Sequence, residues 1–199
     1  SRIRQFPLKD KENCLYSKDV ISFARKKGYF TGKDKDFSFS EAYAPIDFGA
    51  KRYCEARVWS FFNKWAAEDM KPYQPYAMGE DVNPETKQPI DGIPHEMPLW
   101  VKPKQLLSTQ DVKDMMRDHY EGTPMDITEG LGSLPWNMPY RVTPLSYKVD
   151  GKEYFNERPI STVQSSAIYV AQMRDWLPDY IGGVLWFDSC SHALPRTHL

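Results

Sequence analysis

The sequence lacks long apolar runs and lacks an excess of charge of either sign. No stretch of its 199 residues approaches the roughly 18 apolar side chains that a membrane-spanning helix requires. The 26 basic and 27 acidic side chains leave a net charge of −1, and like charges nowhere form a long run. The short apolar runs therefore predict no membrane span. Nucleic-acid binding needs a basic surface, so we also expect no nucleic-acid partner. No signal-peptide pattern opens the chain, and the sequence leaves the cellular compartment open.

Cysteine is scarce as well. Cys14, Cys54 and Cys190 are far apart, form no CxxC pair and have no histidine at ligand spacing. This pattern excludes a disulfide framework and predicts neither a metal site nor a bound cofactor. Cys54 falls on an apolar helical stripe and Cys14 precedes a helix, so we interpret both as packing residues with inert thiols.

Aromatic residues and prolines are plentiful, and the apolar residues are arranged first with a helical period. Three helices are predicted: one capped by Ser17 and ended by Gly28, one from about residue 50 to 67, and one opened by Ser108. The expected buried stripe of the second helix is Cys54, Val58, Phe61, Phe62 and Trp65, and that of the third is Val112, Met115, Met116 and His119. Six prolines between residues 70 and 98 predict a long surface excursion between these two helices.

The last third of the chain alternates in the manner of strands. Residues 145–149 and 152–155 flank Asp150-Gly151, which predicts a hairpin with a type I′ turn. Residues 162–176 and 181–187 are expected to be further strands, and residues 1–8 alternate as a strand would. Helices followed by an antiparallel meander indicate an α+β fold in a single domain. Its expected parts are a helical part (1–69), the Pro-rich excursion (70–107), a helix and loop (108–142) and the meander (143–188).

Several segments, in this order and spacing, carry a resemblance to a known family. They are Asn13–Tyr16, Asp19–Ala24, Phe37–Pro45, Glu55–Trp59, Met97–Val101, Met116–Pro124, Asn156–Thr162 and Gly182–Phe187. Together they resemble the middle of the bacterial dipeptidase A family, the N-terminal-nucleophile cysteine dipeptidases related to bile salt hydrolases, penicillin V acylases and secernins. The tail from Asp188 to Leu199 departs from the pattern, so no role is carried over to Cys190, His192 or His198.

The resemblance implies a partial αββα sandwich and a nucleophile that is not in this chain. In this class the first residue of the mature protein is the nucleophile, and its own α-amino group, with a pKa of about 7.7–8.0, is the base. The resemblance implies a cysteine upstream of Ser1, so we interpret Ser1 as an internal residue of an enzyme segment rather than as a nucleophile. The chain alone is then expected to hydrolyse no dipeptide.

Three polar residues of the meander are candidates for catalytic support or substrate binding. Arg174 lies at a strand end comparable to one where related acylases have an arginine that supports the nucleophile, and the plainer interpretation is a surface salt bridge at a strand end. Asn156 could contribute an amide to an oxyanion hole. Arg158 could bind the carboxylate of a dipeptide bidentately. For Asn156 and Arg158, the plainer interpretation is that they belong to a polar loop that closes a hairpin.

Two acidic residues are candidates for binding the substrate ammonium group. Glu121 and Asp126 follow the third helix, where the alternative is capping and turn chemistry. His119 lies on an apolar stripe and is interpreted as a core histidine rather than a base.

Three functions remain open at this point. The first is part of a cysteine dipeptidase acting on dipeptides or short peptides. The second is a binding or scaffold domain that has the fold without the nucleophile, and the third is a related amidase for non-peptide amides. Unpaired sheet edges would also favour association with a second copy of the chain.

Overall fold

The computed structural model describes residues 4–10, 12–133, 136–139, 146–162, 165 and 167–188. Over these residues it contains short helices and two small antiparallel hairpins, in agreement with the α+β class. The helices and helical turns are α1 (Val20–Lys26), η1 (Asp34–Asp36), α2 (Phe39–Tyr43), α3 (Phe48–Ala50), η2 (Lys51–Glu55), α4 (Ala56–Trp65), α5 (Ala67–Met70), η3 (Lys71–Tyr73), α6 (Gln74–Met78), α7 (Thr109–Met115), η4 (Leu131–Ser133) and α8 (Asp179–Gly182). The strands are β1 (Ser146–Val149), β2 (Lys152–Phe155), β3 (Ile168–Met173) and β4 (Gly183–Asp188).

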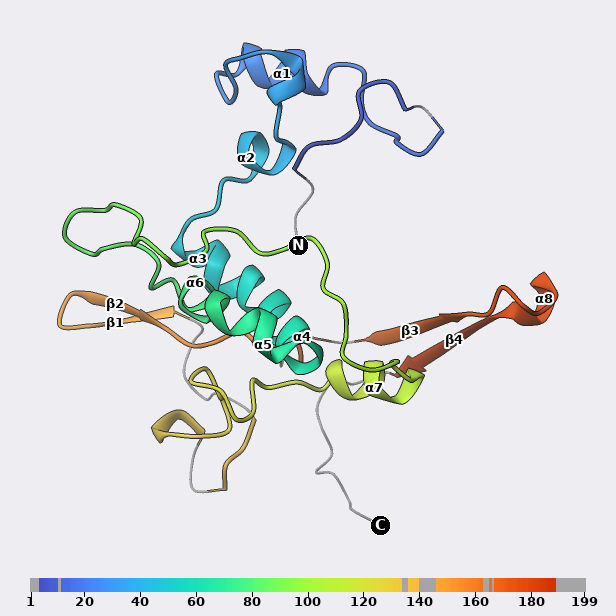
Figure 1. The fold of residues 1–199 in the computed structure, drawn as a ribbon. Helices are drawn as coiled ribbons and strands as arrows, with labels where there is room; N and C mark the ends of the chain where they lie inside the picture. The colour runs from blue at the N-terminus through green and yellow to red at the C-terminus, as the bar shows by residue number, and fades with distance from the viewer. Residues whose placement is uncertain are drawn as a thin grey trace.

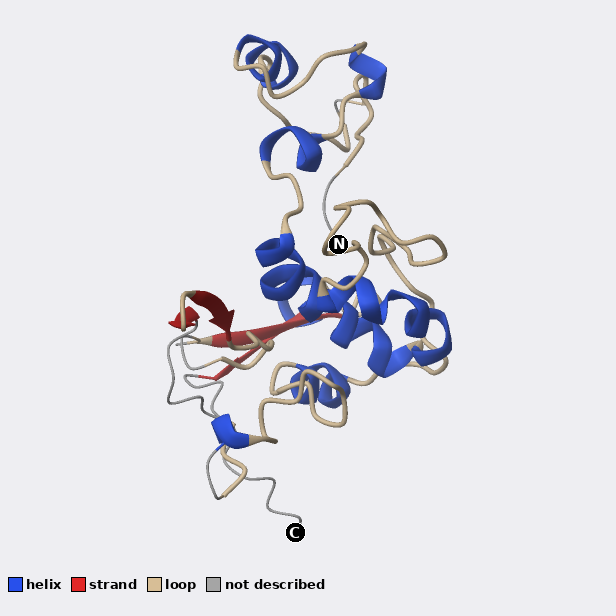
Figure 2. Ribbon diagram, turned by 90° about the vertical axis from the view of Figure 1, so that its left-hand side faces the viewer, coloured by secondary structure: helices blue, strands red, loops and turns tan. Residues whose placement is uncertain are grey.

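The N-terminal part stands apart from the central helices (Figures 1 and 2). It has its own small core, in which Ala24 of α1 and Ala42 of α2 are buried around Phe37. Two details of the prediction are wrong here. The N-cap of α1 is Asp19 rather than Ser17, without a side-chain cap, and residues 4–8 form no strand. Gly28 does follow the end of the helix, with φ of +73°.

The second predicted helix is present, but its buried face is not the predicted one. α3, η2 and α4 follow one another without a break from Phe48 to Trp65, and η2 is a π-helical turn. The buried residues are Arg52 and Glu55 in η2, followed by Ala56, Trp59 and Ser60 in α4. The expected stripe lies on another face, and Cys54 is exposed rather than buried. Tertiary packing against α6 decides the face, and an apolar period alone does not reveal it.

The predicted Pro-rich surface excursion is partly core. Residues 71–78 form η3 and α6, and Met70, Tyr76, Ala77 and Met97 are completely buried. These four side chains join Ala56, Trp59, Tyr120 and Met125 in the main hydrophobic cluster. Prolines at the starts of η3 and α6 cost little, because the first turn of a helix needs no amide donor there.

The strands form two separate hairpins rather than one meander. β1 pairs with β2 from Ser146↔Phe155 to Val149↔Lys152, and the turn residues Asp150 and Gly151 have φ of 51° and 78°. Both values are positive, as the predicted type I′ turn requires. β3 pairs with β4 from Ile168↔Asp188 to Met173↔Gly183, and both strands are shorter than predicted. The two hairpins lie on opposite sides of the central helices (Figure 1).

Candidate functional site

Three segments that are distant in the sequence meet beside the central helix. They are residues 52–60, 118–127 and 156–161, which we call the three-segment site. Arg52 Nη2 lies 2.7 Å from Glu157 Oε1 and joins the first segment to the third. The Ser60 hydroxyl donates to Asp118 Oδ2 at 2.7 Å and joins the first to the second. The Ser161 amide donates to the Asp118 carbonyl at 3.0 Å, so the second and third segments are also in direct contact.

The π-helical turn η2 brings charged side chains to the buried face. Arg52 donates to the Met78 carbonyl at 3.2 Å, and its guanidinium lies 5.2 Å from the centre of the Phe155 ring. Glu55 is also almost completely buried. π-helical turns are rare and occur frequently at functional sites. A buried arginine and glutamate on such a turn therefore mark this face as more than packing surface.

Tyr120 holds the second segment against the third. Its side chain is completely buried, and its hydroxyl donates to the Arg158 carbonyl at 2.9 Å. Its backbone is in the left-handed region, with φ of 65°, which is strained for a bulky residue. Burial, with a further contribution from the charge of Asp118, raises the pKa of the Tyr120 hydroxyl, so the group remains a donor.

Asp118 is a carboxyl of this site whose pKa is shifted upward. Burial raises the pKa of Asp118, and the hydrogen bond from Ser60 offsets only part of that effect. The nearby charge of Glu121 raises the pKa further. A carboxyl whose pKa is raised by burial is a common feature of functional sites.

The structure brings Arg158 and Asn156 into the three-segment site. Both are half-buried. Among the described residues, the Arg158 guanidinium has no carboxylate or carbonyl partner, and its Nε is buried without a hydrogen bond. An unpaired, partly buried guanidinium is suited to an external anion, because it has already lost part of its hydration.

Glu121 and Asp126 also lie here, but their carboxylates are largely used within their own loop. Burial alone would raise the pKa of Glu121, but hydrogen bonds from His119 Nδ1 (3.1 Å) and the His119 amide (2.7 Å) lower it to about 2. Asp126 accepts bonds from the Gly122 amide and from the amide and hydroxyl of Thr128. His119 is buried, as predicted, although it lies beyond the end of α7.

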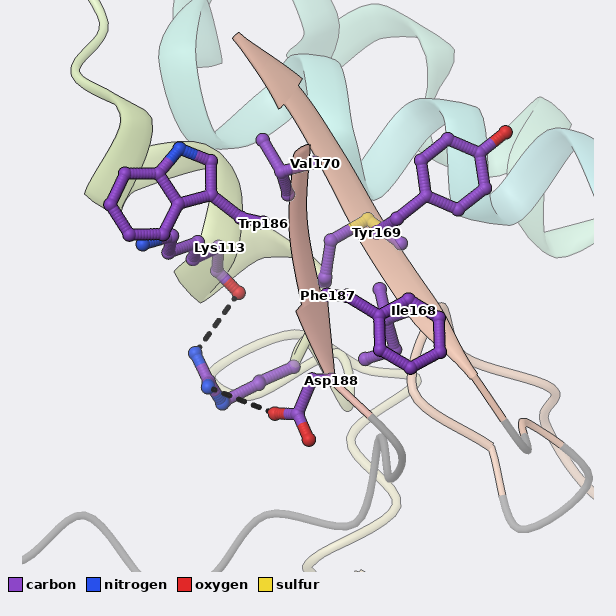
Figure 3. A pocket seen from close by; sticks show the side chains of 9 residues that line it. Lys113, Ile168, Tyr169, Val170, Trp186, Phe187 and Asp188 are labelled. Atoms are coloured by element: carbon purple, nitrogen blue, oxygen red, sulfur yellow. Dashed lines mark hydrogen bonds and ion pairs between the residues drawn. The ribbon is translucent and has the colours of Figure 1, made fainter. Parts of the chain in front are cut away.

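Arg174 is not part of this site. It lies at the far end of β3, where its guanidinium donates to the carbonyls of Ile181 and Gly182 and closes the tip of the β3–β4 hairpin. The other end of this hairpin packs on α7 around a small pocket of about 170 Å³. There the Lys113 ammonium lies 3.4 Å from the centre of the Trp186 ring, and Arg117 lies 3.7 Å from Asp188 (Figure 3). These cations are already engaged, and we interpret the pocket as a packing seam.

A second buried carboxylate lies outside the three-segment site. The Asp81 side chain is 1% exposed, and its carboxylate accepts two hydrogen bonds from Lys51 Nζ, at 2.7 Å to Oδ1 and 2.8 Å to Oδ2. His95 Nδ1 lies 3.0 Å from Oδ2 of the same carboxylate. The cluster fastens the loop after α6 to η2 and is explained by that role.

Sequence reasoning missed Arg52, Arg57 and Asp118. All three belong to segments rich in aromatic and apolar residues, and Arg57 and Asp118 fall within stretches that carry the family resemblance. That resemblance was the available signal, since no local pattern distinguishes a buried arginine from a surface one. Ser1, Cys190, His192 and His198 lie outside the described residues.

Neither a metal cluster nor a membrane span is found in the part of the chain that the structure describes. No group of three or more histidine, cysteine, aspartate or glutamate side chains there could hold a metal ion. None of the described helices is long and apolar enough to cross a membrane.

Comparison with known proteins identifies the family. The sequence profile of Peptidase family C69 matches residues 1–196. A protein described as a probable dipeptidase from Salmonella dublin is 25% identical over 185 residues, which cover 92% of this chain and 34% of that protein. The chain thus spans about a third of the length of that curated relative. Since the profile covers nearly the whole sequence, the chain belongs to Peptidase family C69.

Proposed function

We propose that the chain is part of a dipeptidase and that its three-segment site forms one wall of the binding site for short peptides. The observation that carries the proposal is the half-buried guanidinium of Arg158, which has no carboxylate or carbonyl partner among the described residues, in a chain of a peptidase family. A dipeptide always has a free carboxylate close to its scissile bond, and arginine recognises carboxylates bidentately. Arg158 is the proposed partner of that carboxylate.

The proposed nucleophile is a cysteine at the N-terminus of the mature protein, upstream of residue 1. Its α-amino group would take the thiol proton, and the thiolate would attack the peptide carbonyl. The α-ammonium group would return the proton to the nitrogen of the scissile bond as the C–N bond breaks and the C-terminal residue leaves as an amine. Water would then hydrolyse the thioester, which releases the acyl group as a carboxylate and restores the thiol. The Asn156 amide is the proposed donor to the oxyanion, and Glu121 or Asp126 the proposed partner of the substrate ammonium. Of these two, Glu121 is the better placed, since its side chain remains 51% exposed. Arg174 would support the catalytic strand from a distance rather than touch the substrate.

The proposed fold of the complete enzyme is the αββα sandwich of N-terminal-nucleophile hydrolases. β1–β2 and β3–β4 are two-stranded hairpins whose outer edges pair with no other described strand. Isolated two-stranded hairpins are marginally stable in water, so we expect both to join larger sheets.

The test is a kinetic comparison on the protein with its natural N-terminus. Arg158→Gln should raise KM for Ala-Phe about ten- to hundredfold, because a hydrogen-bonded ion pair is lost, and should change kcat less. Hydrolysis of the corresponding dipeptide amide should be unaffected by the substitution. Arg117→Gln, a half-exposed arginine in the α7 seam, is the matched control.

Each outcome separates the candidate functions. A loss specific to substrates with a free carboxylate supports the dipeptidase. Cleavage of non-peptide amides in preference to any dipeptide would instead identify an amidase, and no hydrolysis of either class would favour a binding domain. Mass spectrometry of the mature N-terminus gives an independent check, since the mechanism requires a cysteine there.

A further inference from the structure

An open groove runs along the side of the three-segment site. It is lined by the apolar stripe of the central helix, namely Val58, Phe61 and Phe62, and also by Phe39 and Ile160. Its volume of about 770 Å³ is sufficient for a large side chain with part of its backbone. The sequence predicts this stripe to be core, yet the structure leaves its side chains only partly covered. We call this hollow the α4 groove.

Arg57 supplies the positive charge of the α4 groove. Among the described residues, its buried Nε has no hydrogen-bond partner, and its Nη2 contacts the Cys54 sulfur, at 4.0 Å. Five other described arginines, at positions 4, 25, 52, 117 and 174, each bind a carboxylate or carbonyl oxygen. Arg57 and Arg158 are the two whose guanidinium groups bind none within the described ranges, and they lie in the same region of the fold.

The Arg57 guanidinium and the backbone carbonyl of Arg158 both act on the Tyr120 hydroxyl. The Tyr120 hydroxyl donates to the Arg158 carbonyl, and the charge of Arg57 lowers the pKa of that same hydroxyl against the larger effect of burial. Ile160, two residues after Arg158, lines the groove together with Arg57. The third segment therefore passes from the proposed carboxylate-binding arginine directly into the α4 groove.

We propose that the α4 groove is the subsite for the C-terminal residue of a short peptide that ends in a large apolar residue. Its side chain packs against Val58, Phe61 and Phe62, and Arg57 donates to its free carboxylate as a second guanidinium beside Arg158. The inference rests on the proposed function and adds a preference to it. Charge complementarity favours this ligand. An apolar groove lined by one cation, Arg57, with no carboxylate or carbonyl partner among the described residues matches an apolar side chain next to one carboxylate.

Cys54 provides a direct reporter of occupancy. It is exposed and lines the groove, whereas Cys14 is not among the lining residues and serves as an internal control. The experiment measures the rate of iodoacetamide labelling at each cysteine by peptide mass spectrometry, on the protein with its natural N-terminus. The probe is Ala-Phe with its peptide bond replaced by CH2–NH, which cannot be hydrolysed. The matched probes are the Ala-Ala analogue and the C-terminal amide of the Ala-Phe analogue.

The Ala-Phe analogue should slow labelling of Cys54 and leave Cys14 unchanged. The Ala-Ala analogue should need about tenfold higher concentration for the same protection, because it lacks the apolar side chain. The C-terminal amide should protect about ten- to hundredfold less well, because it offers Arg57 no charge. Arg57→Gln should reduce the difference between acid and amide to the part that Arg158 maintains, and Arg57→Lys should restore some of the rest.

Arg57 touches the Cys54 sulfur, so labelling rates are compared with and without probe within each variant. Equal labelling of Cys54 with and without the Ala-Phe analogue overturns the subsite, and so does full discrimination between acid and amide in Arg57→Gln. If dipeptides are hydrolysed while Cys54 is never protected, the subsite fails and the proposed function stands. If Cys54 is protected while no dipeptide is hydrolysed, the groove binds as proposed and the dipeptidase assignment fails.

Discussion

Tyr120→Phe tests whether the second and third segments of the candidate site are held together by one buried hydrogen bond. The substitution removes only the hydroxyl that donates to the Arg158 carbonyl at 2.9 Å. The ring stays, and so do its packing in the main cluster and its left-handed backbone. Any effect therefore reports the hydrogen bond rather than a cavity.

The expected cost is about 1–3 kcal/mol in the free energy of unfolding. A hydrogen bond contributes about 1 kcal/mol net, and a buried acceptor left without a partner costs about 1–3 kcal/mol. The Tyr120 side chain is completely buried, so water does not easily replace the hydroxyl. For a domain of this size the midpoint of thermal unfolding should fall by roughly 2–10 °C.

The assay is urea unfolding followed by tryptophan fluorescence, with Tyr53→Phe as the matched control. The Tyr53 side chain is only half-buried, and its hydroxyl makes no hydrogen bond within the described residues, so its loss should change stability by less than about 0.5 kcal/mol. Equal effects of the two substitutions would refute the reasoning. Amide exchange should also become faster at Ser161, whose amide donates to the Asp118 carbonyl in the same junction.

Three further predictions concern stability and association. Burial raises the folded-state pKa of Asp118, so its contribution to the free energy of unfolding is favourable at low pH and is lost as the pH rises through that pKa. Asp118→Asn should therefore be more stable than the unsubstituted protein near neutral pH. This advantage should vanish on acidification, which urea titrations at a series of pH values would measure. Gly79→Ala and Gly92→Ala both place alanine at positive φ, at a cost of about 1–2 kcal/mol each. Only at Gly79 would the new Cβ also lie 2.5 Å from the Phe48 ring, so Gly79→Ala should be the less stable variant. Equal unfolding midpoints of the two variants would count against this contact. The β3–β4 hairpin exposes Tyr169, Trp186 and Phe187 together with unpaired strand edges, so the chain should associate with a second copy in light scattering after size exclusion, and a monomer at all concentrations would contradict this.

Features with a local cause were predictable from the sequence. The capping box of α7 forms as expected, with the Ser108 hydroxyl bonded to the Asp111 amide and the Asp111 carboxylate bonded to the Ser108 amide. The type I′ turn at Asp150-Gly151 follows from two residues that tolerate positive φ. Both features depend on residues within a few positions of one another, so an amino-acid pattern is enough to specify them.

The buried face of the central helix could not be predicted in this way. The apolar stripe through Cys54 and Val58 satisfies a helical period, but the structure buries the face that carries Arg52 and Glu55. Arg52 can be buried because it binds Glu157, which is 105 residues away. A pattern of neighbouring residues contains no information about such a partner, and without the partner a buried charge is prohibitively costly.

The sequence by itself determined the α+β class, the three longest α-helices, one turn, and the family resemblance that the profile match confirms. Only the tertiary structure decided which side chains share a site. It brought the Arg158 carbonyl to the Tyr120 hydroxyl, left Arg57 beside an open groove with no carboxylate or carbonyl partner among the described residues, and placed Arg174 at a distant hairpin tip. The physical reason is that helix caps and turns are fixed by local hydrogen bonds, whereas the state of a buried charge is fixed by partners that only folding brings near.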